Sequence, residues 1–411
     1  MRPFGYLLSS TALSNLADGV LKVGAPLLAV SITRSPTEVA LVGVAATLPW
    51  MLFALPAGAI ADRLDRRTIM VVANAARTVI LLAAGTLAAY DLLGLWPMLA
   101  AVLLSSVCEV FADLSAQSVL PMAVPSGEIV RANGRVQTVQ MIGNEFLGSP
   151  IAGVLVVVLP AAVFGASGLL YGVAGLLLLG MRGRFRTPAP AVARSLRADI
   201  GEAMRYLWGH RFLRTMAISA GMLNLANTAY FAVFVLWVVG PGSRMGLEPA
   251  AYGLVTTALG VGAIAGSLLS ERISARFGEG RTLIGAWLLD ALLLLVPLLL
   301  PVPWALYPTA VLLGLFGAAG NVLVVSTRQR LIPAELMGRV NSAYRLIGTC
   351  GMPVGAALGG VLGEWAGLPT VFLAAVVVCL AAVWLLWRVL RDRISAPLTS
   401  NTMISDISRS R

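Results

Sequence analysis

The sequence predicts an all-α polytopic membrane protein of twelve transmembrane helices, arranged as two pseudo-symmetric six-helix bundles around a central cavity. Three observations predict it: an apolar composition, a series of hydrophobic runs, and charged loop motifs that recur in both halves of the chain. Of the 411 residues, 58% are hydrophobic and 12% are charged, and the mean hydropathy is +0.86. Soluble domains carry roughly 25% charged residues. A bilayer is the solvent that such an apolar surface requires.

The hydrophobic runs are long enough to cross a bilayer. A spanning helix needs roughly 20 mainly apolar residues. The runs fall at 7–31, 38–60, 68–89, 95–118, 134–159, 161–181, 212–240, 249–270, 282–300, 304–327, 338–362 and 368–390. The fifth and sixth runs almost merge, and Pro160 is the reason to divide them.

The arginines predict the orientation of these helices. Lys22 is the one lysine among 30 basic residues, so the net charge of +11 is carried by arginine. These arginines lie in the loops after even-numbered helices, in the central loop and in the tail, whereas the opposite loops hold only Arg34 and Arg244. Basic loops stay in the cytoplasm. We therefore expect a multi-pass protein of the cytoplasmic (inner) membrane with both termini cytoplasmic, and no nucleic-acid partner, because the charge forms no patch on a globule.

The central loop divides the chain into two bundles. Pro188 and Pro190 begin it as a linker, and the stretch from Ser195 to Trp208 is amphipathic, which is typical of a helix at the membrane surface. The predicted parts are an N-terminal bundle (1–181), a cytoplasmic linker with an amphipathic helix (182–211), a C-terminal bundle (212–390) and a disordered cytoplasmic tail (391–411).

Three helix–loop junctions of the first half recur in the second half, in the same order. The corresponding segments are 15–18 with 224–227, 62–67 with 271–276, and 134–136 with 338–340. Chance similarity between apolar helices does not explain charged loops that match in register. Six helices per half preserve orientation, so the repeat is parallel and predicts a binding cavity between the halves near the bilayer midplane.

The loop Gly58-Ala-Ile-Ala-Asp-Arg-Leu-Asp-Arg-Arg67 resembles the signature between helices 2 and 3 of the major facilitator superfamily. With the repeat and the helix count, this resemblance covers almost the whole chain. Residues 17–19 and 73–77 look like the branch that contains drug and siderophore exporters. Helix 5 is similar to the glycine–proline motif of proton-coupled antiporters, carried by Gly143, Gly148, Pro150 and Gly153. Ser149 and Ala152 depart from that motif.

The loop between helices 2 and 3 is interpreted as a gating loop. Its residues Gly58, Asp62, Arg63, Arg66 and Arg67 are expected to bring helix ends together, since glycine permits close helix approach and arginine forms charge-assisted hydrogen bonds. Asp113, near the cytoplasmic end of helix 4, is expected to pair with these arginines. Anchoring by positive charge alone is the alternative interpretation.

Acidic residues inside the membrane are the candidate proton-coupling sites, because a buried charge is costly and marks function by default. Asp18 lies near the middle of helix 1, with Lys22 one turn further on the same face, so the two form either a structural pair or a switchable site. Glu145 has no charged neighbour at helical spacing on its own helix, which suits a proton carrier. Glu109, deeper in helix 4 than Asp113, is a third candidate.

Further buried charges are expected to act as partners of these acids. Arg77 in helix 3 is expected to pair with Glu109, Asp18 or an anionic substrate. Asp290 and Arg345 belong to the second half, and the simplest expectation is that they pair with each other. The first half carries Asp18 where the second has Asn227, which places proton coupling in the first half.

Polar and aromatic residues are predicted to line the substrate cavity. They are Asn15, Asn227, Tyr230, Phe234, Trp237 and Tyr344. Rings of this kind bind apolar or cationic ligands, although most such residues pack against lipid or neighbouring helices.

The function predicted from these features is that of a proton-driven secondary transporter that exports drugs or small amphipathic metabolites by alternating access. The alternatives are a siderophore or natural-product exporter and, from another class, a channel or lipid scramblase. The sequence has no nucleophile–histidine arrangement or phosphate loop, and with His210 as its one histidine and three scattered cysteines it suggests no metal site. We expect no enzymatic activity and no cofactor. The expected partners are a small-molecule substrate, protons and the lipid bilayer, and the chain is expected to be a monomer.

Overall fold

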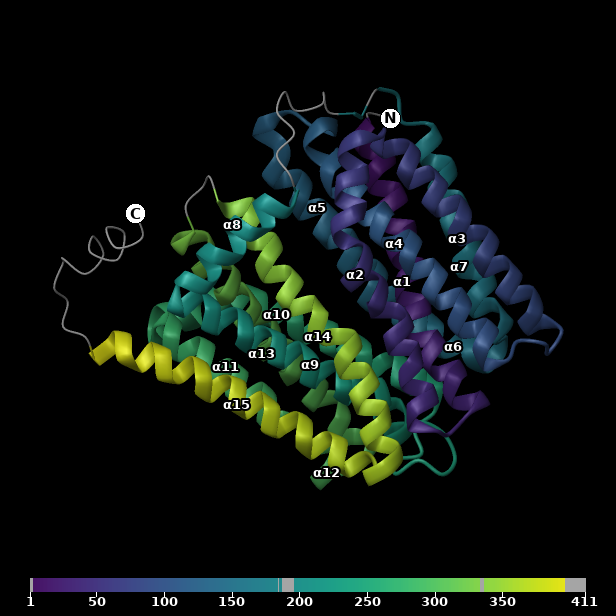
Figure 1. The fold of residues 1–411 in the computed structure, drawn as a ribbon. Coiled ribbons are helices and arrows are strands. Elements are labelled where there is room, and N and C mark those ends of the chain that lie inside the picture. Colours follow the sequence, from purple (N-terminus) through teal and green to yellow (C-terminus); the bar gives the residue numbers. More distant parts are fainter. Residues whose placement is uncertain (1–2, 184, 187–195, 333–335, 396–411) are drawn as a thin grey trace.

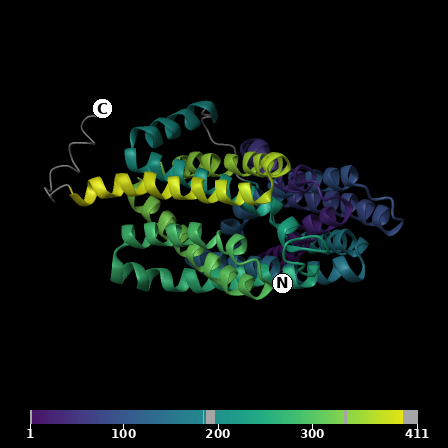
Figure 2. The same ribbon diagram turned by 90° about the horizontal axis from the view of Figure 1, so that it is seen from below.

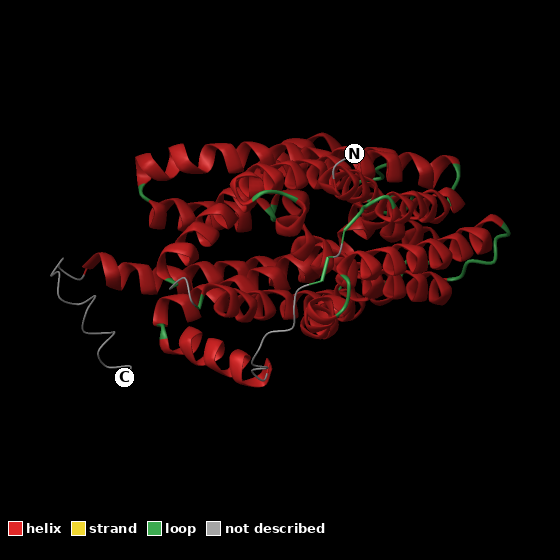
Figure 3. Ribbon diagram, turned by 90° about the horizontal axis from the view of Figure 1, so that it is seen from above, coloured by secondary structure: helices red, strands yellow, loops and turns green. Residues whose placement is uncertain are grey.

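The computed structural model of the chain describes residues 3–183, 185–186, 196–332 and 336–395. The described residues form helices and connecting loops without a β-strand (Figure 3). Helices α1 to α4 are Pro3–Ile32, Pro36–Arg63, Arg66–Ala89 and Leu95–Ala123, followed by the short η1 (Ser126–Glu128), α5 (Ile129–Met141), η2 (Ile142–Gly148), α6 (Ser149–Val158) and α7 (Ala161–Leu179). The remaining helices are α8 (Leu196–Gly209), α9 (Arg211–Val238), α10 (Pro249–Phe277), α11 (Glu279–Leu293), α12 (Val296–Leu299), α13 (Pro303–Leu331), α14 (Met337–Ala366) and α15 (Leu368–Ser395).

Among the described residues, twelve helices are long and apolar enough to cross a membrane, which confirms the predicted fold class. Most observed spans extend past the predicted ends where the loops are rich in arginine. The eighth span, α10, was expected to end at 270 and continues to Phe277 through Ser270, Glu271 and Arg272. A hydropathy pattern detects only the apolar part of a helix, which is immersed in lipid. It does not detect a polar extension of the same helix beyond the bilayer.

The fifth span is divided into α5, the π-helix η2 and α6. The π-helical segment Ile142–Gly148 carries the first two glycines of the antiporter-like motif, and Pro150 lies in the first turn of α6. The sequence predicted a continuous span here. A π-helical turn inside an α-helix is rare and frequently found at functional sites.

The central linker contains a helix where the sequence is amphipathic. This helix, α8, packs against α9 and α14, and Leu207 is fully buried. The Tyr206 hydroxyl donates to the carbonyl oxygen of Leu331 at 3.4 Å, and burial raises the pKa of this phenol. Residues 187–195 and the predicted disordered residues 396–411 lie outside the described residues, whereas 391–395 belong to α15.

Two bundles make up the molecule, α1–α7 in one and α9–α15 in the other (Figures 1 and 2). The repeat in the sequence has a counterpart in the contacts. Asn15 of the first span accepts a hydrogen bond from Asn144 of the fifth at 3.0 Å, and Asn224 of the seventh span donates to Gly348 of the eleventh at 3.0 Å. Each bundle therefore joins its first and fifth helices through an equivalent asparagine.

The bundles touch mainly along two pairs of helices, α2 with α14 and α6 with α10. Figure 1 shows them converging at its lower end and separated at its upper end, where α1 begins and α8 lies. We call this upper end the arginine-rich end. The spans α2, α4, α10 and α13 end there, and the loops that follow these spans carry the arginines. Glycines permit the α6–α10 contact: a Cβ at Gly253 would lie 2.6 Å from the carbonyl oxygen of Ser149, and one at Gly153 would lie 2.6 Å from that of Pro249.

Candidate functional site

A polar cavity of about 520 Å³ lies near the arginine-rich end, mainly inside the first bundle. Its lining comes from α1, α3, α4 and α5, with one residue of the second bundle. The lining residues are Leu7, Ser10, Thr11, Ser14, Asn15, Met70, Asn74, Arg77, Ala112, Asp113, Ala116, Gln117, Leu120, Asn133, Val136, Gln137, Gln140 and Arg345. None of these is aromatic, and two thirds are polar or charged, so the cavity offers hydrogen bonds and charge rather than rings.

A second cavity of about 390 Å³ lies between the two bundles. It shares Asn15, Asp113, Gln137 and Gln140 with the first cavity. Its remaining lining residues are Met141, Asn144, Glu145, Leu259, Gly260 and Ala263. A polar path thus leads from the interior of the first bundle to the surface that it shares with α10 of the second.

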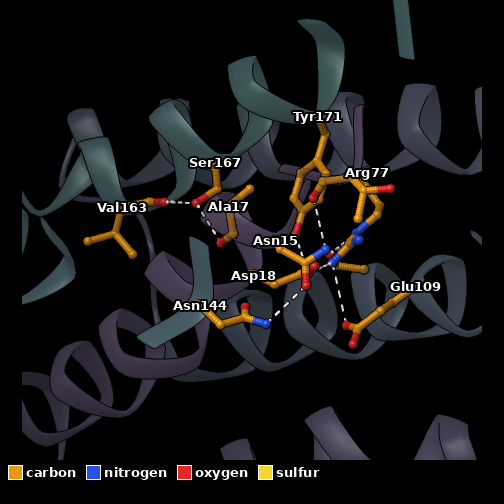
Figure 4. Close-up of polar contacts among 11 residues, drawn as sticks. Asn15, Ala17, Asp18, Arg77, Glu109, Asn144, Val163, Ser167 and Tyr171 are labelled. Atoms are coloured by element: carbon orange, nitrogen blue, oxygen red, sulfur yellow. Dashed lines mark hydrogen bonds and ion pairs between the residues drawn. The ribbon is translucent and has the colours of Figure 1, made fainter. Parts of the chain in front are cut away.

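Arg77 is the centre of the buried charge network beside these cavities (Figure 4). Its side chain is 2% exposed, and its Nη2 atom lies 2.5 Å from Asp18 Oδ1 and 3.4 Å from Glu109 Oε2. Its Nε donates to Ser105 Oγ at 3.1 Å, and its guanidinium lies 3.8 Å from the ring centroid of Tyr171. The Tyr171 hydroxyl donates to Asp18 at 2.5 Å. Two carboxylates therefore share one guanidinium, which leaves one negative charge of this trio without a cation when both acids are ionised.

The predicted partners of Arg77 are thus both present, but the predicted Asp18–Lys22 pair is wrong. Lys22 instead forms an ion pair with Glu145, with 2.9 Å between Nζ and Oε1. The sequence interpretation treated Glu145 as an acid without a cation, because it considered spacing along one helix. The cation comes from α1, which packs against η2 at that level. Lys22 remains 66% exposed and Glu145 23% exposed, so the pair lies at a surface rather than in a sealed core.

Asp113 lines both cavities, away from the arginines with which it was predicted to pair. Arg66 donates to Met122 and Arg67 donates to carbonyls of α7, and the described contacts include none between either arginine and Asp113. Asp113 shares the lining of the first cavity with Arg77 and with Arg345 of the second bundle. Arg345 also lies 5.3 Å from the ring centroid of Trp50.

The alternative pairing of Arg345 with Asp290 is absent from the described ion pairs. Asp290 lies on α11 beside Gly317 of α13, whereas Arg345 lines the cavity of the first bundle. The described residues contain no group of three histidine, cysteine, aspartate or glutamate side chains that could hold a metal ion.

The loop between α2 and α3 ties helix ends together. Arg67 donates from Nε to the Leu178 carbonyl at 2.8 Å and from Nη2 to that of Leu179 at 2.5 Å, at the last turn of α7, where carbonyls lack helical partners. Asp65 caps α3 by accepting from the Thr68 backbone at 3.2 Å. Arg63 ends α2 and is exposed, and the side chain of Asp62 lies outside the described residues.

The glycines predicted to permit close packing separate into two groups. A Cβ at Gly58 would meet nothing within 4 Å, so the predicted close approach at this residue is wrong. A Cβ at Gly143 would lie 2.9 Å from the backbone nitrogen of Leu16, and one at Gly148 would lie 2.7 Å from Gly19 Cα. The first two glycines of the antiporter-like motif hold the fifth span against α1, and Gly153 holds it against α10.

The aromatic residues predicted for the cavity lie elsewhere. Tyr230 and Phe234 are 1% and 5% exposed and pack against Phe372, with ring centroids 4.5 and 6.2 Å apart. Trp237 packs on the same Phe372 ring, and Tyr344 is buried beneath Arg328. Of the six predicted cavity residues, including Asn227, only Asn15 lines either cavity.

Several polar residues of the site escaped the sequence interpretation. These residues are uncharged: Tyr171, Ser105, Asn74 and the glutamines of α5. A single hydroxyl or amide changes the mean hydropathy of an apolar run too little to be noticed. The available signal was the group of amides at 133, 137 and 140, which recurs at helical spacing and faces one side of α5.

Twelve spanning helices in two similar bundles, with polar cavities within and between them, define a multi-pass membrane transporter. Residues 2–406 match the model of the family MFS_3, described as transmembrane secretion effector. The chain belongs to this family of the major facilitator superfamily.

Named relatives agree with this assignment, and solved structures share the fold. The chain is 27% identical to the multidrug efflux pump Tap of Mycobacterium tuberculosis, over 96% of both chains, and 25% identical to that of Mycolicibacterium fortuitum, over 90% of this chain and 92% of the relative. Its fold is similar to a mutant of the nucleoside transporter NupG (TM-score 0.75, 13% identity, 94% and 99% coverage). It is also similar to a bacterial homologue of the iron transporter ferroportin in an inward-facing state (TM-score 0.74, 16% identity, 94% and 98% coverage).

Proposed function

We propose that the chain is a proton-driven exporter of drugs or small amphipathic metabolites that works by alternating access. We place its arginine-rich end in the cytoplasm, as the positive-inside rule requires, and the separation of the bundles at that end supports an inward-facing arrangement. We further propose that the protein acts as a monomer. The relatives named as multidrug efflux pumps support export of drugs. The position of the large cavity near the arginine-rich end supports uptake of the substrate from the cytoplasmic side.

The observation that carries proton coupling is the sharing of Arg77 by Asp18 and Glu109. An acid inside a membrane is tolerated when it is paired or protonated. With one guanidinium for two carboxylates, the trio accepts either a proton or a cationic group of a ligand. A ligand that leaves as the proton arrives then exchanges drug for proton.

The coupling of this exchange to movement follows from the position of the acids. Asp113 lines both cavities and Glu145 lines the cavity between the bundles, where Thr257 of α10 donates to the Glu145 backbone carbonyl at 3.1 Å. Protonation of these acids changes the charge at the interface between the two bundles, which rearranges during alternating access. A proton shifts the equilibrium only insofar as it binds one arrangement more tightly than the other.

The proposal is tested by proton-driven uptake of ethidium and a panel of other fluorescent drugs into inside-out vesicles. We expect Asp18→Asn and Glu109→Gln each to lower uptake by about tenfold or more, within the usual range of coupling between two sites. Glu279→Gln is the matched control, because its carboxylate pairs with Arg330 at an exposed surface away from the cavities. Uptake that persists at the parental rate in both variants, or without a pH gradient, would contradict proton coupling.

A further inference from the structure

The bundles are joined by charged side chains at the end opposite the arginine-rich end. Arg34 lies in the turn between α1 and α2 and reaches across to the second bundle, donating to the carbonyl oxygens of Val239 at 3.1 Å and Pro241 at 3.3 Å. Gly240, between these carbonyls, has a φ of +87°, and a Cβ there would lie 2.6 Å from Arg34 Nη2. The backbone of the second bundle is therefore shaped to receive this guanidinium.

A second contact runs in the opposite direction, from an acid of the second bundle to the first. Glu364 of α14 accepts from Ser35 Oγ at 2.6 Å and from the Thr37 backbone nitrogen at 3.3 Å. Ser35 is the N-cap of α2, so the carboxylate lies where the helix has free N–H groups and a positive dipole end. The second bundle thus completes the helix start of the first.

Small residues bring the two backbones together behind these charges. A Cβ at Gly360 would lie 2.6 Å from Ala40 Cβ and 3.1 Å from the Pro36 carbonyl oxygen. Thr37 Oγ1 donates to the carbonyl oxygen of Gly360 at 3.3 Å. The start of α2 therefore cannot move away from α14 without losing the polar contacts and this packing together.

We propose that Arg34 and Glu364, with their partners, form an outer seal that sets the balance between the two arrangements of the bundles. The inference rests on the proposed alternating access, in which this end must open. Both charged side chains are exposed, and exposed charge contacts are individually weak. The seal is therefore reversible, and loss of both charged contacts favours the arrangement that is open at this end.

Access to the cavity from each side tests the outer seal. The reporter is Gln140→Cys, which lines both cavities, in a chain whose three cysteines (Cys108, Cys350 and Cys379) are changed to serine. A membrane-impermeant thiol reagent is added to right-side-out or inside-out vesicles. We expect the parent to react from the arginine-rich side, and Arg34→Ala with Glu364→Gln to react about tenfold faster from the opposite side, as a shifted two-state equilibrium requires.

Two exposed residues at the same end supply matched controls. Arg244→Ala and Glu248→Gln remove a like charge each, and neither side chain makes a described contact across the seal. We expect these variants to react at the parental rate. A double seal variant that also reacts at the parental rate from that side, while its melting temperature matches the parent, would overturn the proposal.

A reversible cross-link separates the seal from the proposed function. Ser35→Cys with Glu364→Cys is oxidised with copper phenanthroline, which we expect to block drug uptake until dithiothreitol restores it. Uptake that continues through the cross-link would overturn the seal. If no panel drug is taken up by any variant, but the seal variant still exposes Gln140→Cys, the proposed function fails and the seal stands.

Discussion

Arg77 on α3 and Asp18 on α1 form a buried ion pair, with 2.5 Å between Nη2 and Oδ1, and the aromatic ring of Tyr171 covers the guanidinium. The pair and Tyr171 link α1, α3 and α7 of the first bundle, and Glu109 adds α4, with its Oε2 atom 3.4 Å from Arg77 Nη2. A charge at this depth is retained only with partners. The network therefore supports the packing of the bundle as well as the proposed proton exchange, and the two roles can be separated by experiment.

Arg77→Met is expected to destabilise the protein strongly. Removal of one partner of a buried pair leaves an uncompensated charge and costs about 3–5 kcal/mol. The measurement is thermal unfolding of the purified protein in detergent. Arg77→Met with Asp18→Asn should recover part of the loss, because the orphaned carboxylate is gone. Arg345→Met is the control, since this arginine lines the cavity and is exposed.

Lys22→Gln and Glu145→Gln are expected to destabilise the protein less than Arg77→Met does, because the Lys22–Glu145 pair is partly exposed whereas Arg77 is buried. The Lys22 side chain is 66% exposed. Under the proposed function, Glu145→Gln should nevertheless abolish drug–proton exchange in proteoliposomes, because the acid lies at the interface with α10. Exchange at the parental rate in this variant would remove Glu145 from the coupling residues.

The fold was predictable because the bilayer imposes it. Twelve apolar runs, with arginine at alternate loops, leave few other architectures for the chain. The division of the fifth span was not predictable from the hydropathy pattern, and the π-helical turn coincides with the close packing of Gly143 and Gly148 on α1. Those contacts are between helices, and spacing along one helix carries no information about them.

The same limit explains the errors at the site. Helical spacing placed Lys22 beside Asp18, and both do lie on α1, but Arg77 and Tyr171 of other helices take Asp18. Lys22 therefore forms its ion pair with Glu145 instead. Residue types identified which charges were costly, whereas their pairing depended on the rotation of each helix about its axis, which the tertiary packing sets.

Gly262→Ala is expected to lower the thermal stability of the protein, whereas Gly58→Ala is expected to keep or raise it. A Cβ at Gly262 would collide with the carbonyl oxygen of Val311 on α13, and overpacking of this kind costs about 1–3 kcal/mol. A Cβ at Gly58 meets nothing within 4 Å, and alanine is the better helix former by about 1 kcal/mol. Thermal unfolding should show a lower melting temperature for Gly262→Ala and an unchanged or higher one for Gly58→Ala. A large loss of stability in Gly58→Ala would show that this glycine has an unrecognised neighbour.

Phe372→Ala is expected to destabilise the second bundle without changing which drugs are transported. The ring is fully buried and packs against Tyr230, Phe234 and Trp237, so truncation removes the centre of the cluster and costs about 3–5 kcal/mol. The measurement combines thermal unfolding with the KM of uptake for several drugs, and Phe372→Leu is the conservative comparison that keeps most of the buried volume. If the aromatic cluster only supports the bundle, KM stays constant for every drug in whatever fraction remains folded. A selective rise in KM for planar aromatic drugs would instead place this cluster in the substrate path, because aromatic rings bind planar ligands by stacking.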